Sequence, residues 1–365
     1  MGRRGVELAR QPQVADGMRV DVAKRDPAMT SKELVYQALA FEPVPRVPYA
    51  LAFTIAATEK FLASPGGREL FERVDNDVMF VGAIRVEWGV RDETGHYVDE
   101  FGVDFDRTID ADIGNPSPIV TLENLSAYRW PDPVADGRFD KLAENLRQFP
   151  DKFHLMALDF SLYERAWSLR GMENLLGDFM ENRDFVCELL DRIVEFNVAL
   201  IEAGLKQCPQ VDGVYFGDDF GQQSGVVMGP PLWRELLKPR LARQYGVAKA
   251  AGKKVVIHSC GRVQELFDDL VEIGVDCFNP FQPEVMNVHE YHDRYHGRMA
   301  FWGGVSTQRT LPYGSVQDVQ REVEGLLAMG RRGGYIISPA HAMPGDVKSE
   351  NVAAMLKMII DQPGA

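Results

Sequence analysis

Short apolar runs rich in β-forming residues alternate with longer amphipathic segments along most of this chain. Eight such runs are predicted strands, at residues 46–53, 77–83, 153–158, 211–217, 254–259, 275–280, 298–304 and 334–339. Helical patterns that close on Gly lie between the later runs, at 229–252, 262–274 and 315–330. Eight β/α repeats predict an α/β protein, a TIM (β/α)8 barrel in one domain spanning 29–365.

Two regions depart from this alternation. Residues 84–135 are predicted as a hairpin and loops inserted after the second strand, because "VRDETGHYVDEFGVDFDR" and "YRWPDPVADG" lack a helical period. Residues 1–28 mix Arg, Asp, Gln and Gly without a hydrophobic period, and they are predicted as a flexible tail. This tail has no apolar core of the kind that a signal peptide needs.

The composition limits the classes of partner. The net charge of −14 disfavours nucleic acid and anionic membrane surfaces as partners, and no apolar run is long enough to span a bilayer. The four cysteines, at 187, 208, 260 and 277, are too few for a disulfide framework in 365 residues, so we expect a cytoplasmic protein. The oligomeric state is left open, with a homodimer as one option.

Polar residues gather where the later predicted strands end. The active sites of TIM barrels are built at the C-terminal ends of the strands, so these residues are the first functional candidates. They are Asp218 and Asp219 after the fourth strand, His258 and Cys260 at the fifth, Asn279 and Gln282 at the sixth, and His341 after the eighth.

His258 and Cys260 are two residues apart, so in an extended strand their side chains point the same way. Imidazole and thiolate are both zinc ligands, and His341 is the nearest candidate for a third ligand. The set would leave one coordination position open for substrate or water. A His-x-Cys pair alone is a weak signal, and it more often belongs to a buried strand end that holds no metal.

Other candidates have competing structural explanations. Asp218 and Asp219 are adjacent, so only one can face the barrel axis; it would act as a base, ligand or substrate contact, unless both cap the next loop. Glu164 follows the third strand and is either a site carboxylate or half of a surface ion pair with Arg165. Trp302 either walls a substrate pocket or packs in the core.

Four stretches carry a family resemblance: "VYFGDDFGQQSGVVMGPPLWRELLKPRLARQ", "GKKVVIHSCGRVQELFDDLVEIGVDCFNPFQPE", "FWGGVSTQRTLPYGSVQDV" and "GGYIISPAHAMPGDVKSENVAAM". With these, the chain resembles the uroporphyrinogen decarboxylase superfamily over about residues 30–362. The resemblance implies a TIM barrel. The superfamily divides into branches with different chemistry. Its decarboxylases carry an arginine-rich "MRQAGRY" motif, and this chain has "YALAFTIAATEKFL" at that place.

The branch that the chain resembles contains zinc-dependent methyltransferases working with corrinoid proteins. Their motif is a His-x-Cys followed by a further Cys in a "PGCG" context; here His258 and Cys260 match, and His341 in "SPAHAMPGD" stands in place of that Cys. The resemblance therefore implies zinc on these three residues, cobalamin on a separate corrinoid protein, and methyl transfer to or from a small O-methyl, S-methyl or thiol substrate.

Within that mechanism, Asp218, Asp219, Glu164 or Gln222 would orient the substrate or complete the zinc shell, beside Asn279, Gln282 and Trp302 in the pocket. Two alternatives remain from the sequence: a metal-free decarboxylase of tetrapyrrole biosynthesis, and a ligand-binding barrel without turnover.

Overall fold

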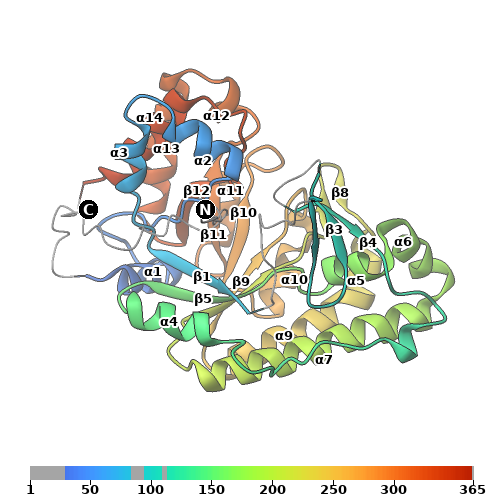
Figure 1. The fold of residues 1–365 in the computed structure, drawn as a ribbon. Coiled ribbons are helices and arrows are strands. Elements are labelled where there is room, and N and C mark those ends of the chain that lie inside the picture. The colour runs from blue at the N-terminus through green and yellow to red at the C-terminus, as the bar shows by residue number, and fades with distance from the viewer. Residues whose placement is uncertain (1–28, 84–93, 109–112, 364–365) are drawn as a thin grey trace, which may run out of the picture.

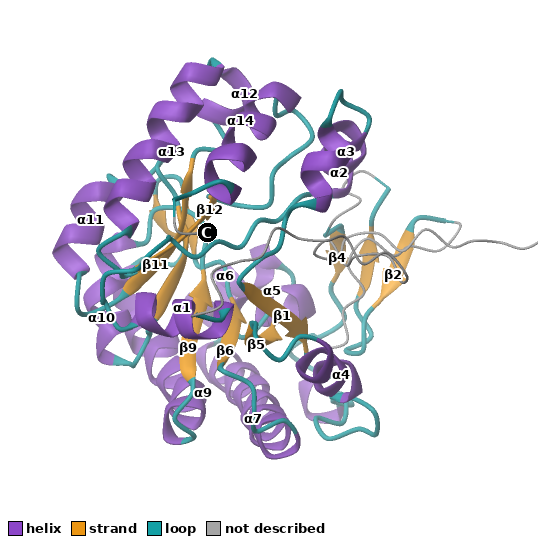
Figure 2. Cartoon of the chain, turned by 90° about the vertical axis from the view of Figure 1, so that its left-hand side faces the viewer, coloured by secondary structure: helices purple, strands orange, loops and turns teal. Residues whose placement is uncertain are grey.

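A parallel sheet of seven strands forms the centre of the molecule in the computed structural model, which describes residues 29–83, 94–108 and 113–363. The strand order is β1-β5-β6-β9-β10-β11-β12, and every neighbouring pair is parallel. The sheet curls on itself with helices around its outside (Figure 2). The expected α/β class with a parallel sheet is confirmed, as a TIM-like fold.

The sheet strands are buried on both faces, which explains their continuous apolar runs. All six residues of β5 and all five of β6 are buried, for example. The strands are β1 (Val78–Gly82), β5 (Phe153–Leu158), β6 (Gly213–Gly217), β9 (Lys254–His258), β10 (Cys277–Phe281), β11 (Ala300–Val305) and β12 (Tyr335–Pro339).

The first predicted strand, 46–53, is not a regular strand among the described residues. It makes only isolated bridges, Tyr49 with Ile337 and Phe53 with Met343. The Tyr49 carbonyl also accepts the amide of Asp77 at 2.9 Å, so the segment lies between β12 and the start of β1, the place of an eighth strand. Pro48 explains the irregularity, because proline has no N–H to donate to a ladder.

Most of the helices surround the sheet on its outside (Figure 2). Their bounds are α1 (Ser31–Leu39), α2 (Ile55–Leu62), α3 (Gly67–Glu72), η1 (Leu125–Ala127), α4 (Asp140–Gln148), α5 (Tyr163–Arg170), α6 (Met172–Glu181), α7 (Arg183–Gln207), α8 (Pro230–Leu232), η2 (Trp233–Leu237), α9 (Lys238–Ala250), η3 (Gln264–Leu266), α10 (Phe267–Glu272), α11 (Val288–Tyr295), α12 (Thr310–Tyr313), α13 (Val316–Gly330) and α14 (Ser349–Ile360). The helix predicted over 315–330 is α13, whereas the one predicted over 229–252 is interrupted by the π-helical turn η2 just before Pro239.

Helix α1 covers the N-terminal end of the sheet (Figure 2). Its Val35 and Leu39 belong to the apolar cluster inside the curled sheet, together with Val78 and Phe153. The C-terminal ends of the strands are therefore the open end, as the site prediction requires.

The described part of residues 84–135 contains a separate antiparallel sheet of three strands. These are β2 (His96–Val98), β3 (Asp104–Asp106) and β4 (Asn115–Ser117), where the sequence predicts a hairpin and loops. A further two-stranded hairpin, β7 (Gly221–Gln222) with β8 (Gly225–Val226), follows β6. Both lie to the right in Figure 1, on the side toward which β1 and β5 point, so they flank the open end of the main sheet.

The predicted tail at 1–28 lies outside the described residues. Within the described ranges, no helix is long and apolar enough to cross a membrane.

Candidate metal centre

The strand register brings the predicted site residues side by side. His258, at the end of β9, lies beside Gly217 on one neighbouring strand and Asn279 on the other. Side chains alternate along a strand, and Tyr215, Val256 and Trp302 all belong to the interior cluster. Residues two or four positions further along the same strands therefore point the same way. His258 and Asp219 are such residues, and they face the inside of the open end.

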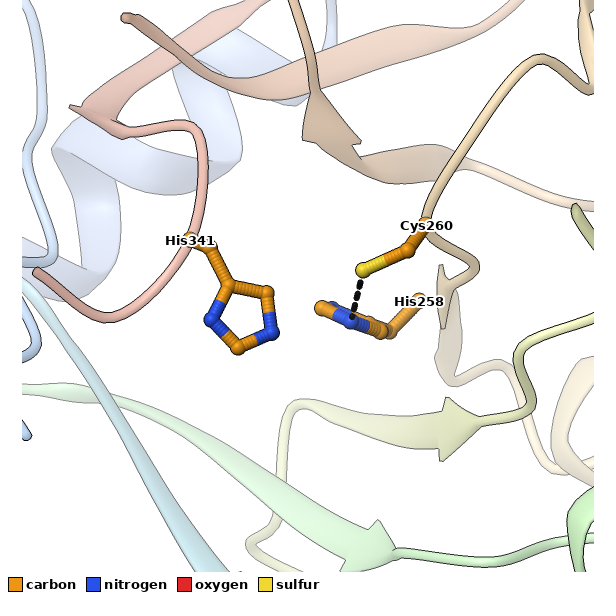
Figure 3. A group of neighbouring side chains, drawn as sticks. All are labelled: His258, Cys260 and His341. Atoms are coloured by element: carbon orange, nitrogen blue, oxygen red, sulfur yellow. Dashed lines mark hydrogen bonds between the residues drawn. The ribbon is translucent and has the colours of Figure 1, made fainter. Parts of the chain in front are cut away.

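His258, Cys260 and His341 come together as a metal triad. One potential ligand atom from each residue lies within 4.8 Å of the others, and Cys260 Sγ is 3.3 Å from His258 Nε2. His341 faces His258 from a loop on the opposite side (Figure 3), with the two rings 5.4 Å apart. No other group of three such ligands occurs in the part of the chain that the structure describes.

The loop of His341 is held by the segment that precedes α2. The Met343 amide donates to the Ala52 carbonyl at 3.0 Å, and the Thr54 amide donates back to the Met343 carbonyl at 3.1 Å. The irregular first segment thus fixes the third member of the triad, although it is not a regular strand.

A hydrogen bond to Asn279 fixes the tautomer of His258. His258 Nδ1 lies 2.5 Å from Asn279 Oδ1, and Asn279 Nδ2 donates to the Trp302 carbonyl at 3.0 Å. Because the amide oxygen can only accept, the proton is on Nδ1 of His258, and the lone pair of Nε2 points toward Cys260 Sγ. Such a partner behind a histidine is typical of metal sites.

Replacing Asn279 with Leu is expected to weaken zinc binding by about 10- to 100-fold, because the His258 ring loses the acceptor that orients it. Asn279→Asp, which keeps an acceptor at that position, is the matched control and should bind zinc at least as tightly as the wild type. Competition with a fluorescent zinc chelator measures both constants. Equal zinc affinity in Asn279→Leu and the wild type would show that Asn279 has no such role.

The protonation states in the triad suit a metal that displaces a proton. Desolvation is the largest cause that lowers the pKa of His341 to about 4, and the neighbouring His258 is the second. The ring is therefore neutral at pH 7, although the residue is partly open to solvent at the open end. Burial and the adjacent Asp219 raise the pKa of the Cys260 thiol. A cation would oppose both effects on the sulfur and favour the thiolate.

The triad fits zinc by donor type, and the distance between Cys260 Sγ and His258 Nε2 fits it as well. Zinc binds imidazole nitrogen at about 2.0–2.1 Å and thiolate sulfur at about 2.3 Å in a tetrahedron, which places neighbouring ligand atoms about 3.3–3.8 Å apart. The Sγ to Nε2 distance of 3.3 Å is within this range. Three protein ligands with one free position are typical of catalytic zinc.

The two adjacent aspartates face in opposite directions. Asp218 is buried and accepts the Glu164 amide at 2.8 Å, so it caps the start of α5; burial raises its pKa to about 7. Asp219 faces the triad, with Oδ1 accepting the Cys260 amide at 2.7 Å and lying 3.7 Å from His258 Nε2. Asp219 is therefore the one of the pair placed for chemistry.

Glu164 lies in the first turn of α5, close to both aspartates. Desolvation and the negative charges of Asp219 and Asp218 raise its pKa well above the usual value. A carboxyl group with a raised pKa binds a proton more readily than an ordinary glutamate, so it is suited to proton transfer.

The remaining predicted pocket residues have different surroundings. Gln222 is exposed on β7, and its carbonyl accepts the Arg262 amide at 2.8 Å. Gln282 is buried and accepts the Gly261 amide at 3.1 Å, which supports the turn after Cys260. Trp302 faces the interior cluster, with its ring centroid 6.3 Å from that of Tyr215.

Two site residues are absent from the sequence prediction. Asp159 is the first residue after β5, at the parity of Ala157, and its carboxyl oxygen lies against Gly217. Tyr215 stacks on Phe80 below the triad, with ring centroids 5.6 Å apart. The strand-end rule identifies Asp159, and the period of two that places His258 inside also identifies Tyr215 once β6 is aligned with β9.

Comparisons with known proteins agree with this fold. Among solved structures, a methyltransferase from Methanosarcina mazei aligns with a TM-score of 0.68 at 17% identity, covering 92% of this chain and 100% of that chain. That likeness shows the fold. Dispersin B aligns with a TM-score of 0.38 at 12% identity over 88% of this chain and 100% of that chain, too low a score to carry an argument. No curated protein matches the chain in sequence.

The family assignment comes from the sequence model of a known family. The model described as "Uroporphyrinogen decarboxylase (URO-D)" matches residues 98–361, a span that includes β9, β12 and all three residues of the metal triad. The resemblance expected from the sequence is thereby confirmed, and the chain belongs to the uroporphyrinogen decarboxylase family.

Proposed function

We propose that this protein is a zinc-dependent methyltransferase that moves a methyl group between a small substrate and a corrinoid protein. The observation that carries the proposal is the metal triad, whose three ligand atoms lie within 4.8 Å of one another at the open end of the sheet. The methyltransferase from Methanosarcina mazei shares the fold, and its activity supports the choice of reaction class.

His258, Cys260 and His341 would hold the zinc, with one position left for the substrate heteroatom. Bound there, zinc supplies Lewis acidity, which lowers the pKa of a thiol or makes an ether or thioether a better leaving group. The hydrogen bond between Asn279 and Nδ1 of His258 keeps Nε2 free to act as a metal ligand. Asp219 holds the backbone of Cys260 in place from the side opposite Asn279.

In the thiol direction, the substrate sulfur loses its proton and attacks the methyl carbon of methylcobalamin. The S–C bond forms as the C–Co bond breaks, and the electron pair of that bond stays on the corrinoid, which leaves as cob(I)alamin. In the reverse direction cob(I)alamin attacks the methyl carbon, and the leaving heteroatom takes up a proton. Glu164, whose pKa is raised by burial and by the neighbouring Asp219, is the residue that we propose supplies that proton.

The charge of the site supports this proposal over a metal-free decarboxylation. Desolvation and the negative charges of Asp219 and Asp218 raise the pKa of the Glu164 carboxyl, and a site lined by these carboxyl groups disfavours a substrate carrying several carboxylates. The sequence "YALAFTIAATEKFL", where the decarboxylases carry their arginine motif, agrees with this.

Methyl transfer tests the proposal directly. Zinc-loaded protein is incubated with methylcobalamin and a panel of thiols, and separately with cob(I)alamin and O- and S-methyl donors, while the corrinoid spectrum is followed. We expect turnover with at least one substrate and none in a Cys260→Ala variant. Turnover that is equal in this variant and in the wild type would contradict the proposal, as would decarboxylation of uroporphyrinogen by metal-free protein.

A further inference from the structure

The hydroxyl group of Tyr215 is an unused polar group at the floor of the candidate site. The residue is 9% exposed, and its ring centroid lies 6.2 Å from that of His258. Among the described residues, this hydroxyl has no hydrogen-bond partner, whereas the buried hydroxyl of Tyr335 donates to the Gly303 carbonyl at 2.5 Å. This hydroxyl oxygen is not among the fully buried atoms that lack a partner, so it is accessible to a ligand from the open end.

The surroundings of this hydroxyl are acidic. Asp159, Asp219 and Glu164 all act on Tyr215 electrostatically and raise its pKa, together with burial, which is the largest cause. Asp219 also lies beside the triad, because its Oδ1 is 3.7 Å from His258 Nε2. The carboxyl groups and the phenol therefore share one side of the metal triad.

Aromatic faces complete that side of the site. Phe80 stacks on Tyr215 at an interplanar angle of 6°, and the Trp302 ring lies 6.3 Å from both. Phe80 is only partly buried, so the ring group is accessible from the open end. Ring faces and carboxylates together are the chemistry that binds an organic cation.

We propose that the substrate is a thiol, or the methyl thioether made from it, that carries a protonated amine a few bonds from the sulfur. The proposal rests on the proposed function, since the sulfur would occupy the open position of the triad. A primary ammonium has three N–H donors, and Asp219 and the phenolic oxygen of Tyr215 offer acceptors on the side where the amine would lie. A positive charge beside Glu164 would favour its carboxylate form, which offers a further acceptor. A thiol with a sulfonate or carboxylate tail meets repulsion there instead.

Three thiols on the same two-carbon skeleton test this inference by charge alone. They are cysteamine, 2-mercaptoethanol and 2-mercaptoethanesulfonate, with positive, neutral and negative ends. The readout is binding to cobalt(II)-substituted protein, followed by the sulfur-to-cobalt charge-transfer band and corrected for the thiolate fraction of each compound. We expect cysteamine to bind about tenfold or more tightly than 2-mercaptoethanol, and the sulfonate to bind weakest.

Two variants and a control locate the preference. Tyr215→Phe and Glu164→Gln should each lower the affinity for cysteamine toward that for 2-mercaptoethanol. The affinity for 2-mercaptoethanol itself should not change. Asp318→Asn, which changes a partly exposed side chain in the first turn of α13, should leave the whole series unchanged. Equal affinity for the three thiols, or tightest binding of the sulfonate, overturns the inference but leaves the methyltransferase proposal standing. A cobalt-loaded protein that binds none of them and transfers no methyl group overturns both.

Discussion

His258→Ala is expected to reduce bound zinc from about one per chain to well below a tenth, and methyl transfer by about 10³-fold. The substitution removes the imidazole whose Nε2 lies 3.3 Å from Cys260 Sγ. It also removes the ring whose tautomer is fixed by the hydrogen bond to Asn279. The rate estimate assumes that the bound metal contributes several kcal/mol, each 1.36 kcal/mol being a factor of ten. Zinc analysis by mass spectrometry and single-turnover kinetics give the two quantities.

The matched control is His289→Ala, which changes an exposed histidine on α11. It should keep both the zinc and the activity. A His258→Ala protein that still holds one zinc per chain with unchanged affinity would contradict the assignment of the triad.

His341→Cys restores the thiolate expected from the family motif, and it should retain zinc while making the site less electrophilic.

Asp77→Ala is expected to lower the free energy of unfolding by about 3–5 kcal/mol, because it leaves the guanidinium of Arg46 buried without its partner. Asp77 is fully buried, and its carboxylate accepts hydrogen bonds from Arg46 Nη1 at 2.7 Å and Nη2 at 2.5 Å. It also accepts the Ser31 hydroxyl at 2.6 Å and the Tyr49 amide at 3.0 Å. One carboxylate thus joins α1, the irregular first segment and the start of β1.

Urea denaturation followed by circular dichroism measures this loss. The double variant Asp77→Leu with Arg46→Met removes both charges and should recover much of the stability, since no unpaired charge stays buried. Arg321→Ala, which breaks an exposed pair with Asp318, should produce no measurable change. A change in Asp77→Ala as small as that in Arg321→Ala would show that the buried pair does not hold the first segment in place.

The triad could be predicted from the sequence because parallel strands end at the same edge of a sheet. His258 and Cys260 share a strand end, and His341 follows another, so a barrel brings them together although about eighty residues separate them. The sequence also predicts that only one of Asp218 and Asp219 faces inward. Which one does so depends on the register of β6 against β9, and that register appears only in the structure.

The irregular parts of the fold could not be predicted in the same way. Residues 46–53 have the composition of a strand, but their backbone bonds are divided between β12 and Asp77. Asn279 has the residue type of a substrate ligand, and its contact with His258 Nδ1 is a tertiary distance that no spacing encodes. Tyr215 has the same limitation, since an aromatic residue in a buried strand usually packs in the core.

The central claim is that a sulfur and two imidazoles bind one zinc ion at the end of the sheet. X-ray absorption at the zinc edge of protein produced in zinc-supplemented medium tests it most directly. We predict about one zinc per chain, with one sulfur neighbour at about 2.3 Å and nitrogen or oxygen neighbours at about 2.0–2.1 Å; the sulfur signal should disappear in Cys260→Ala. Protein with well below one zinc per chain, or bound zinc without any sulfur neighbour, would contradict the claim.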